Sequence, residues 1–350
     1  MEVNIKHAFL KNEIDYKNRT VMEVYVKTIG KTLKAEEGSN LLDVLLENNI
    51  PISYSCMSGR CSTCQCTLVD GEVLKREGIV ENNLLSDDGN ILACTSILSQ
   101  ENITIEIPEP DEIVQHVAVK RKGTITNYTK VTDDVRVLRV KPNKPVDFTG
   151  GQYVQIQFGN ESPRSYSMAT TAKDSELEFH IRIIPDGRVT SKLDAIAENN
   201  EKLRITGPLG ASYVRLKNDD PIICIGGGTG LAPMVSVARG ALEANNLKSV
   251  ELFFGVKYEQ DIYYVDELKA LQKEYPNFTY HVVVECADEN SSYLSGYVTD
   301  AVAKTHKNLA GFRVYLGGSP PMVDAASALV KDLGADPTRV YSDAFFDSSI

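Results

Sequence analysis

Three cysteines with a short, uneven spacing carry the clearest chemistry in this chain. Cys56, Cys61 and Cys64 follow the pattern C-x4-C-x2-C, and Cys94 comes later in the segment L-A-C-T-S. Three thiolates on one loop with a fourth from a distant segment form the plant-type ligand pattern of a [2Fe–2S] cluster. Structural zinc is the alternative, but zinc usually takes two C-x2-C pairs, and Cys94 has no cysteine two or three residues away. The spacing therefore predicts a [2Fe–2S] site with these four cysteines as its metal ligands.

Two other residues near these ligands have less specific roles. Arg60 precedes Cys61 and either tunes the cluster or meets a partner, or is simply a solvated loop charge. Cys66 lies on the strand predicted to follow the loop, and we expect it to pack in the core.

A glycine-rich turn provides a second candidate site. G-G-G-T-G-L-A-P, residues 226–233, follows a short apolar strand at 221–225 and precedes a helix predicted over 234–244. Glycines let the backbone approach a ligand, and a helix N-terminus favours a pyrophosphate. The spacing is not G-x-G-x-x-G, so this segment alone is equally typical of a tight turn.

A nucleotide site and a one-electron cluster in one chain imply a third site between them. A nicotinamide gives up two electrons as a hydride, whereas the cluster accepts one electron at a time, and a flavin is the usual converter. The segment R-S-Y-S then has an assignment: Arg164 neutralises phosphate, Tyr166 covers the ring and Ser167 hydrogen-bonds near flavin N5. Gly187 to Thr190, poised to open a helix, would take the rest of the pyrophosphate. Taken alone, R-S-Y-S would be ordinary strand residues.

The elements around these motifs change character along the chain. Residues 22–34 read as a hairpin, Ser39 and Asn40 cap a helix at 41–48, and strands follow at 66–69 and 103–107, which matches a β-grasp ferredoxin. Residues 116–213 alternate apolar and polar positions between turns, which predicts an antiparallel six-stranded β-barrel. From residue 221, strands at 221–225, 250–256, 280–285 and 313–316 alternate with helices, which predicts a doubly wound parallel sheet.

These changes predict the domain boundaries. Residues 1–21 look like an extension without an assigned function, 22–112 the ferredoxin-type domain, 116–213 the FAD-binding barrel and 220–350 the NAD(P)-binding domain. Pro108 to Glu112 (P-E-P-D-E) reads as a stiff acidic linker.

Composition narrows the class of protein. The chain has 350 residues, 42% of them hydrophobic, and a net charge of −11. Residues 1–112 contain 10 Lys and Arg against 19 Asp and Glu. This acidic balance favours either simple solubility or a docking face for a redox partner. It argues against nucleic acid as a binding partner. There is no apolar run of membrane-spanning length and no secretory signal. Seven cysteines then suggest reduced thiols and a cytoplasmic location.

The chain resembles a known family. I-S-Y-S-C-M-S-G-R-C-S-T-C with L-A-C-T-S is similar to the ferredoxin domain of ring-hydroxylating dioxygenase reductases, most of all the naphthalene dioxygenase type. The resemblance runs from about Val21 to Ile350 in the same domain order, and R-S-Y-S, G-R-V-T and G-G-G-T-G-L-A-P look like the family's FAD and NAD motifs.

The resemblance implies further site residues. Lys257 and Asp261 would flank the adenosine half of the nucleotide, and Phe345 would shield the flavin where nicotinamide must stack, or simply anchor the tail. His180 would lie beside the flavin, although a strand histidine satisfied by its neighbours is an equal possibility. The expected catalytic residues are Ser167, Thr229 and Phe345. The expected cofactor-binding residues are Arg164, Ser165, Tyr166, Ser167, His180, Arg182, Gly187, Arg188, Val189, Thr190, Gly228, Thr229, Gly230, Lys257, Asp261, Gly318, Met322 and Phe345.

One segment departs from the family pattern. In Y-L-G-G-S-P-P-M, Gly317 stands where the family usually has a cysteine beside the nicotinamide, while Gly318 is kept. We therefore expect nucleotide binding to persist and Gly317→Cys to speed flavin reduction by NADH.

The resemblance implies an oxidoreductase of the ferredoxin–NAD(P)+ reductase type, an iron–sulfur flavoprotein for aromatic compound catabolism. Electrons would pass from NADH through FAD and the [2Fe–2S] cluster to a Rieske ferredoxin or terminal oxygenase. NADPH stays open, since Lys257 suits a 2′-phosphate whereas Glu259 and Asp261 would repel one. The alternatives are a reductase for a monooxygenase or deoxysugar dehydratase, and a non-enzymatic carrier with a vestigial nucleotide module. A membrane partner is not expected.

Overall fold

The computed structural model describes residues 21–52, 54, 59, 64–75, 89–99, 102–107, 116–199, 202–210, 212–217, 219–245 and 247–345. The chain divides into two compact units. The first comprises Met1–Ile50 and Cys66–Ile107, and the second comprises Pro51–Gln65 and Pro108–Ile350.

The first unit is the predicted β-grasp fold. Its sheet has the strand order β2-β1-β7-β3-β5, in which β1 pairs antiparallel with β2 and parallel with β7. Alternate residues of β1 (Met22, Val24 and Val26) are buried because successive side chains of a strand point to opposite faces. The elements are β1 (Val21–Val26), η1 (Lys27–Ile29), β2 (Lys31–Glu36), α1 (Leu41–Glu47), β3 (Gln65–Asp70), β4 (Val73–Lys75), β5 (Asn90–Leu92), η2 (Ala93–Thr95), β6 (Ser96–Leu98) and β7 (Asn102–Glu106).

Helix α1 begins where the sequence predicts it. The Asn40 side-chain oxygen accepts the N–H groups of Leu42 and Asp43 at 3.1 and 3.3 Å, which satisfies donors that have no partner within the helix. The Asn40 amide also donates to the Cys94 carbonyl at 2.9 Å. One residue therefore starts the helix and holds the backbone of a predicted ligand.

The second unit begins with the predicted barrel. Six antiparallel strands run in the order β11-β10-β13-β8-β9-β12, and an isolated bridge between Met168 and Phe179 nearly closes the sheet. Apolar side chains from all six strands fill the interior. The elements are β8 (Val119–Lys130), β9 (Val135–Pro142), β10 (Tyr153–Phe158), β11 (Arg164–Ser167), β12 (Leu177–Arg182), η3 (Thr190–Lys192), α2 (Leu193–Glu198) and β13 (Leu203–Leu209).

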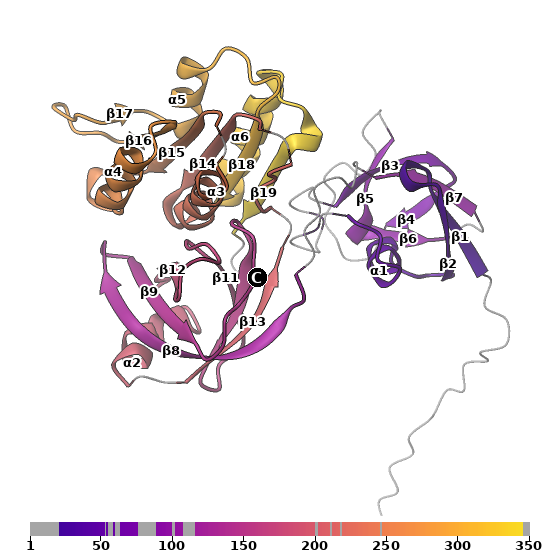
Figure 1. Ribbon diagram of the computed structural model, residues 1–350, viewed down its shortest axis with the longest axis horizontal. Coiled ribbons are helices and arrows are strands. Elements are labelled where there is room, and N and C mark those ends of the chain that lie inside the picture. The colour runs from indigo at the N-terminus through magenta and orange to yellow at the C-terminus, as the bar shows by residue number, and fades with distance from the viewer. Residues whose placement is uncertain are drawn as a thin grey trace, which may run out of the picture. The chain divides into compact units, whose positions relative to one another are not determined.

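A doubly wound parallel sheet completes this unit (Figure 1). Its order is β17-β16-β15-β14-β18-β19, and every pair is parallel. Helices α3 and α4 contribute to the core on one face, and α5 and α6 to the core on the other. The elements are β14 (Ile222–Gly227), η4 (Gly228–Gly230), α3 (Leu231–Glu243), β15 (Val250–Val256), η5 (Glu259–Asp261), α4 (Val265–Glu274), β16 (Phe278–Val284), β17 (Leu294–Ser295), α5 (Val298–Thr305), β18 (Arg313–Gly318), α6 (Pro320–Asp332), η6 (Pro337–Arg339) and β19 (Val340–Ala344).

The barrel and the parallel sheet are joined by buried polar contacts. Ser236 of α3 donates to the Thr170 carbonyl at 2.6 Å and accepts the Gly151 N–H at 3.1 Å. Arg239, one turn later, forms two hydrogen bonds with Asp174 at 2.8 and 3.1 Å. Helix α3 therefore serves both as a wall of the parallel sheet and as the attachment point of the barrel.

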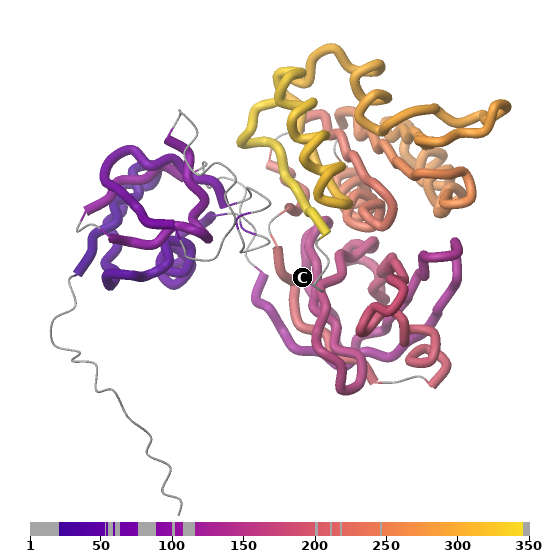
Figure 2. The backbone as a smooth tube through the Cα atoms, turned by 180° about the vertical axis from the view of Figure 1, so that it is seen from behind, coloured from indigo at the N-terminus to yellow at the C-terminus, as the bar shows by residue number. Residues whose placement is uncertain are grey.

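Two of the differences between the structure and the sequence prediction lie at the glycine turn and at the C-terminal end of the described residues. Helix α3 begins at Leu231 rather than Met234, because the glycine turn leads straight into it. Strand β19, which was not predicted, lies parallel to β18 and runs toward the barrel (Figure 2).

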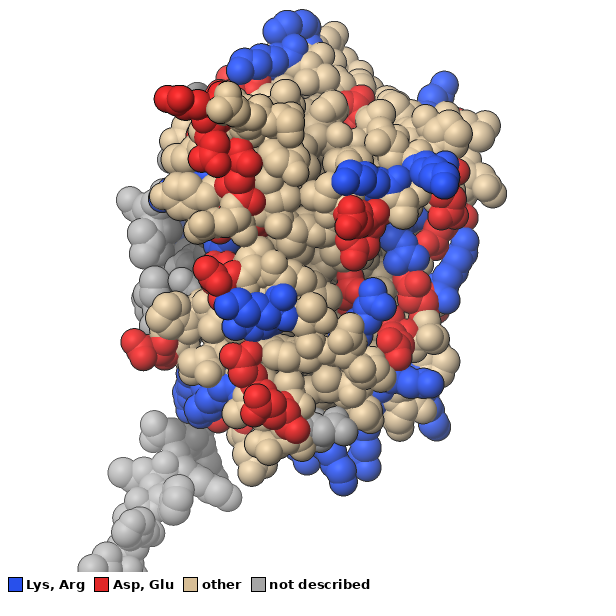
Figure 3. Space-filling view, turned by 90° about the vertical axis from the view of Figure 1, so that its left-hand side faces the viewer, with Lys and Arg blue, Asp and Glu red and all other residues tan. Residues whose placement is uncertain are grey.

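The outer surface has two further properties. On the face shown in Figure 3, basic and acidic side chains are interspersed, without an extended basic patch of the kind that binds nucleic acid. Among the described residues, no helix has the length and apolar character needed to cross a membrane.

Candidate functional site

A cavity of about 2050 Å³ lies between the barrel and the carboxyl ends of the parallel strands. Its volume exceeds the roughly 300–1,000 Å³ typical of a site for one small ligand, so it has room for two dinucleotides. Of the predicted cofactor-binding residues, all but Gly230 and Gly318 line it. Parallel sheets bind ligands at this edge.

Strand β11 carries the R-S-Y-S segment along the barrel wall of the cavity. Ser165 and Ser167 share one face of the strand, and Ser165 is exposed while Ser167, at the end of the strand, is buried. Tyr166 makes edge contacts with Phe158 and Phe179, with ring centroids 6.1 and 6.5 Å apart, and burial raises the pKa of its phenol to about 12. The Tyr166 ring is thus fixed by the barrel core beside a cation, Arg164, which can meet a phosphate.

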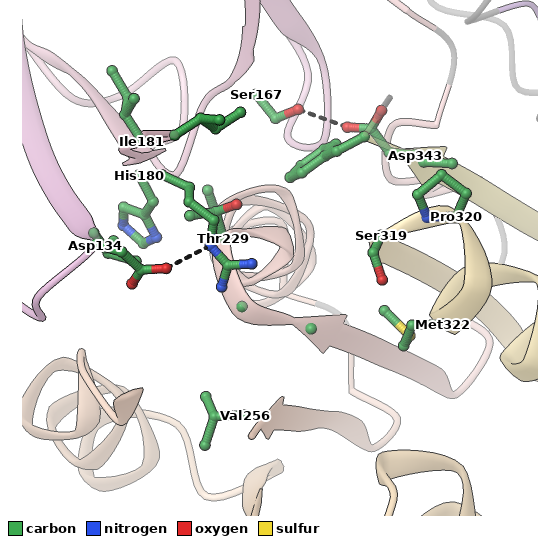
Figure 4. A pocket seen from close by; sticks show the side chains of 18 of the residues that line it. Asp134, Ser167, His180, Ile181, Thr229, Val256, Ser319, Pro320, Met322 and Asp343 are labelled. Carbon is green, nitrogen blue, oxygen red and sulfur yellow. Dashed lines mark hydrogen bonds and ion pairs between the residues drawn. The ribbon is translucent and has the colours of Figure 1, made fainter. Parts of the chain in front are cut away.

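Ser167 meets a residue that sequence analysis did not single out. Its hydroxyl donates to the Asp343 carboxylate at 2.6 Å, and both side chains are buried (Figure 4). Burial raises the pKa of Asp343 to about 6, although the hydrogen bond from Ser167 lowers it. The pair places a carboxyl that can gain or lose a proton near neutral pH against the cavity.

The glycine turn forms the opposite wall. Gly228 has φ +54°, and a Cβ there would lie 2.7 Å from Arg182 Nη2. A Cβ on Gly230 would lie 2.1 Å from the Gly317 carbonyl oxygen, so Gly230 serves close packing of the turn against β18 rather than the cavity. Gly227, Gly228, Thr229 and Ala232 are the residues of this segment that line the cavity.

His180 is held by neighbours at one edge of the cavity. Its Nδ1 lies 3.0 Å from the Tyr263 hydroxyl, and its Nε2 lies 3.4 Å from Glu178 Oε1. Its side chain is fully buried. The structure thus agrees with the reading of His180 as a satisfied strand histidine, although the residue also lines the cavity.

Arg182 lies over the glycine turn. Its Nε pairs with Asp134 Oδ2 at 3.1 Å, and each of the two side chains is about half exposed, 51% and 48% (Figure 4). A guanidinium beside Gly228 is placed where a phosphate on this turn would be neutralised. In the structure Asp134 competes for that cation.

The segment from Gly187 to Thr190 closes the barrel side of the cavity. A Cβ on Gly187 would lie 2.6 Å from Thr190 Oγ1 and 2.8 Å from the Ile184 carbonyl, so only glycine fits this turn. Thr190 Oγ1 accepts the Ile184 N–H at 3.1 Å, while Arg188 stays exposed on the cavity wall. This arrangement suits a cofactor phosphate held by backbone and one arginine.

The far end of the cavity is lined by Lys257 and Asp261. Lys257 Nζ lies over the Tyr258 ring, 5.2 Å from its centroid, and Asp261 accepts the Tyr258 N–H at 3.0 Å. Glu285 and the exposed Tyr297 lie at the same end. An aromatic ring, one cation and two carboxylates together suit an adenosine.

The segment from Gly317 to Met322 is shaped by close packing. Gly318 has φ +143°, and a Cβ there would lie 2.7 Å from Met322 Cε. A Cβ on Gly317 would lie 3.0 Å from the Gly230 carbonyl oxygen and 3.1 Å from Met234 Cε. A cysteine at 317 would require these neighbours to move by a few tenths of an ångström, and the expected effect of Gly317→Cys on flavin reduction stays a prediction.

The predicted cluster ligands are described only in part. Cys56, Cys61 and Arg60 lie outside the described residues. Cys64, at the start of β3, and Cys94, in η2, are both buried. Cys66 is 2% exposed and packs in the core of the first unit, as the sequence indicates.

Several cavity residues were assigned no role from the sequence. Asp343, Tyr263 and Ser319 line the cavity, and Ser319 stands within Y-L-G-G-S-P-P-M. Asp343 could have been suspected only because a single acid stands in an otherwise apolar C-terminal segment, D-A-F-F. Phe345 lies at the cavity with its N–H donating to the Gly318 carbonyl at 2.8 Å.

Three family models match the chain. They describe a 2Fe-2S iron-sulfur cluster binding domain at residues 24–99, an oxidoreductase FAD-binding domain at 85–213 and an oxidoreductase NAD-binding domain at 224–328.

Curated relatives match over nearly the whole chain. One relative is the ferredoxin–NAD(P)+ reductase component of the naphthalene 1,2-dioxygenase system from Pseudomonas putida. It is 42% identical, over 94% of this chain and 100% of its own length. The corresponding component of naphthalene 1,2-dioxygenase/salicylate 5-hydroxylase systems from a Ralstonia species is 45% identical over the same shares. The reductase component of propane 2-monooxygenase from Mycolicibacterium smegmatis is 31% identical, over 89% and 94%.

Solved structures match as well. A cytochrome P450 reductase from Amycolatopsis superposes with a TM-score of 0.71 at 28% identity, covering 94% of this chain and 100% of that one. The ferredoxin reductase in carbazole 1,9a-dioxygenase gives a TM-score of 0.65 at 25% identity, over 94% and 99%.

Proposed function

Because the chain belongs to the family of ferredoxin–NAD(P)+ reductase components of ring-hydroxylating dioxygenase systems, we propose that it carries electrons from NADH to the ferredoxin or terminal oxygenase of such a system. The cofactors are FAD and a [2Fe–2S] cluster, with NAD(P)H as the electron donor. When bound, the flavin accepts a hydride and releases its electrons singly to the cluster. We further propose that the protein works in the cytoplasm.

The observation that carries the proposal is the shared cavity. Two dinucleotide motifs from different folds, R-S-Y-S on β11 and the glycine turn after β14, open into one space of about 2050 Å³. A hydride can pass only when donor and acceptor are within about 3–3.5 Å. A single cavity lined by both motifs allows that approach.

On the barrel side, the proposed roles follow from position. Arg164, Arg188 and the backbone from Gly187 to Thr190 hold the FAD phosphates. Tyr166, fixed by its aromatic neighbours, would cover the flavin ring, and Phe345 would shield the ring where nicotinamide must stack. These side chains also exclude water from the reacting atoms.

On the nucleotide side, the turn and its surroundings receive NADH. Gly228, Thr229 and Arg182 would meet the pyrophosphate, and Thr229 and Met322 would border the nicotinamide, while Gly318 packs behind Met322. Lys257 and Asp261 hold the adenosine half. Glu285 and Asp261 at this end favour NADH, since carboxylates repel the 2′-phosphate of NADPH.

Ser167 and Asp343 are proposed to supply the proton that accompanies the hydride. With a pKa of about 6, the Asp343 carboxyl can hold a proton at Oδ2 and exchange it with Ser167 Oγ, 2.6 Å away. Ser167 stands on the strand that carries the flavin motif, so the proton would reach the site without solvent entering.

The cluster and the partner follow from the family. Plant-type clusters have potentials of about −400 mV, so transfer to a higher-potential Rieske centre is downhill. Cys56, Cys61, Cys64 and Cys94 are the proposed ligands. Monooxygenase reductases are more distant, at 31% identity for the propane enzyme against 42% and 45%, so a dioxygenase partner is preferred.

An anaerobic visible spectrum of the purified protein, recorded before and after NADH, tests the proposal. We expect flavin bands with a cluster shoulder, both bleaching on addition of NADH. A cluster spectrum without flavin, or a flavin that NADH does not bleach, would support the electron-carrier alternative. Reduction of a purified Rieske ferredoxin then tests the partner class, and failure to reduce it while a dye is reduced would reject the dioxygenase assignment.

A further inference from the structure

Strand β12 presents a row of polar side chains toward the nucleotide-binding layer. Phe179 and Ile181 point into the barrel core, so the alternate residues Glu178, His180 and Arg182 occupy the other face. Glu178 and His180 are almost completely buried, with side-chain exposures of 3% and 0%. Such buried polar groups require partners, and the parallel-sheet layer supplies them.

The partners of His180 lead to the glycine turn. The Tyr263 hydroxyl lies 3.0 Å from His180 Nδ1 and 3.3 Å from the carbonyl oxygen of Gly228, and the two rings meet edge to face with centroids 5.2 Å apart. The Gly228 carbonyl also accepts the N–H of Leu231, the first residue of α3. A carbonyl oxygen can accept two hydrogen bonds, so Tyr263 ties the turn to a barrel strand.

Counting protons shows how these bonds are directed. The Tyr263 hydroxyl has one hydrogen. It donates to the Gly228 carbonyl, so His180 Nδ1–H donates to the hydroxyl oxygen. The hydroxyl thus links the His180 ring to the Gly228 carbonyl.

Glu178 is anionic and well held. Arg139 Nε donates to its Oε2 at 2.7 Å and Tyr264 to its Oε1 at 2.8 Å. Burial raises the pKa of Glu178, but these bonds and the contact with His180 outweigh burial and lower it to about 2. The fixed Glu178 carboxylate therefore orients the His180 ring from its Nε2 side, while Tyr263 lies at Nδ1.

We propose that His180 and Tyr263 are positioning residues that hold the Gly228 carbonyl, and with it the nucleotide-binding turn, at a fixed place relative to the flavin-binding barrel. The proposal rests on the proposed hydride transfer between the two layers. Neither residue needs to touch a reacting atom. Their effect reaches the reaction through the turn, because a misplacement of about 1 Å can cost roughly 100-fold in rate.

The test removes one hydroxyl. In Tyr263→Phe the ring stays and the bond to Gly228 is lost. We expect amide hydrogen exchange across residues 226–234 to become faster in the full-length protein without nucleotide. At saturating NADH, stopped-flow reduction of the bound flavin should slow roughly tenfold, while the NADH concentration for half-saturation changes by less than about twofold.

Tyr315→Phe is the matched control. It also removes a buried tyrosine hydroxyl, but that hydroxyl accepts the Arg215 N–H at 2.9 Å and lies outside the cavity and outside the contacts of His180, Glu178 and Gly228. We expect wild-type exchange across residues 226–234 and a wild-type rate. Flavin absorbance and melting temperature of both variants establish that they are folded.

Two results would overturn the proposal. One is wild-type exchange and rate in Tyr263→Phe; the other is equal loosening in both variants, which would mean a general loss of packing. The unaltered protein supplies a further check, since unprotected amides at Gly230 and Leu231 would contradict a held turn. If NADH does not bleach the flavin even in the wild type, the proposed function fails, whereas the exchange comparison still decides the positioning role.

Discussion

The pair of Ser167 and Asp343 shows how burial creates chemistry at the residue scale. The two residues are 176 positions apart, yet the Oγ to Oδ2 distance is 2.6 Å. Burial disfavours the charged form of a carboxyl and thereby moves its pKa from the ordinary value of 3.8 to about 6. An ordinary aspartate loses its proton near pH 3.8, whereas Asp343 keeps its proton up to about pH 6.

Asp343→Asn should change the pH dependence of flavin reduction. The carboxyl is protonated below its pKa of about 6 and ionised above it, so a step that uses its proton slows as the pH rises through that value. The variant keeps an acceptor for Ser167 but has no proton to give, and its rate should be lower and flat. Stopped-flow reduction by NADH across this pH range is the measurement.

Asp332→Asn is the control for this variant, because Asp332 is an exposed residue at the end of α6 that does not line the cavity. It should keep the wild-type profile. A profile in Asp343→Asn that still falls through pH 6 would assign the titration to another group.

At the scale of elements, β12 has a dual role. One face closes the barrel core, and the other presents Glu178, His180 and Arg182 to the nucleotide-binding layer. Arg182 lies against Gly228 while paired with Asp134. Strand β12 therefore places the Arg182 guanidinium beside the glycine turn of the parallel-sheet layer. The Asp134 carboxylate weakens the attraction between this guanidinium and a bound phosphate.

Asp134→Asn should tighten nucleotide binding. The pair is half exposed, and exposed ion pairs contribute about 0.2–1 kcal/mol, so release of Arg182 should raise affinity by at most about fivefold. Calorimetric titration with NAD+ measures the change. Asp133→Asn is the matched control, because Asp133 is exposed, pairs with Lys130 and does not line the cavity. Weaker binding in Asp134→Asn would show that Asp134 instead holds Arg182 in place.

At the scale of the whole molecule, the chain forms two compact units with separate cores. The cavity and all the residues proposed to bind FAD and NADH belong to one unit. Because each unit buries its own apolar residues, damage to one site need not unfold the other.

Cys94→Ser should separate the two redox functions. Loss of a thiolate ligand should remove the cluster absorbance and the reduction of a protein acceptor, while NADH still bleaches the flavin. Cys66→Ala is the control, because Cys66 is a buried core residue of the same unit and its replacement should cost only stability. An intact cluster spectrum in Cys94→Ser would exclude Cys94 as a ligand, and loss of flavin reduction would show that the sites are not independent.

Much of the fold and several site residues could be predicted from local patterns. The Asn40 cap and the alternation of Met22, Val24 and Val26 depend on neighbouring residues, and the structure has both. The positive φ of Gly228 is equally local, whereas Gly230 leaves room for β18, a contact that only the tertiary structure makes. The cysteine spacing predicted an iron–sulfur domain, which the family model at residues 24–99 confirms; the individual ligands stay a prediction.

What no local pattern contained was the meeting of distant segments. Asp343 reaches Ser167 because β19 pairs with β18 and carries the C-terminal segment to the barrel. Tyr263 reaches both His180 and Gly228 because α3 attaches the parallel sheet to the barrel. The spacing of residues along the chain predicts which side chains are neighbours on the same helix, strand or turn. The partner of a buried polar group depends on how separate layers pack, and only packing removes the water that would otherwise have satisfied it.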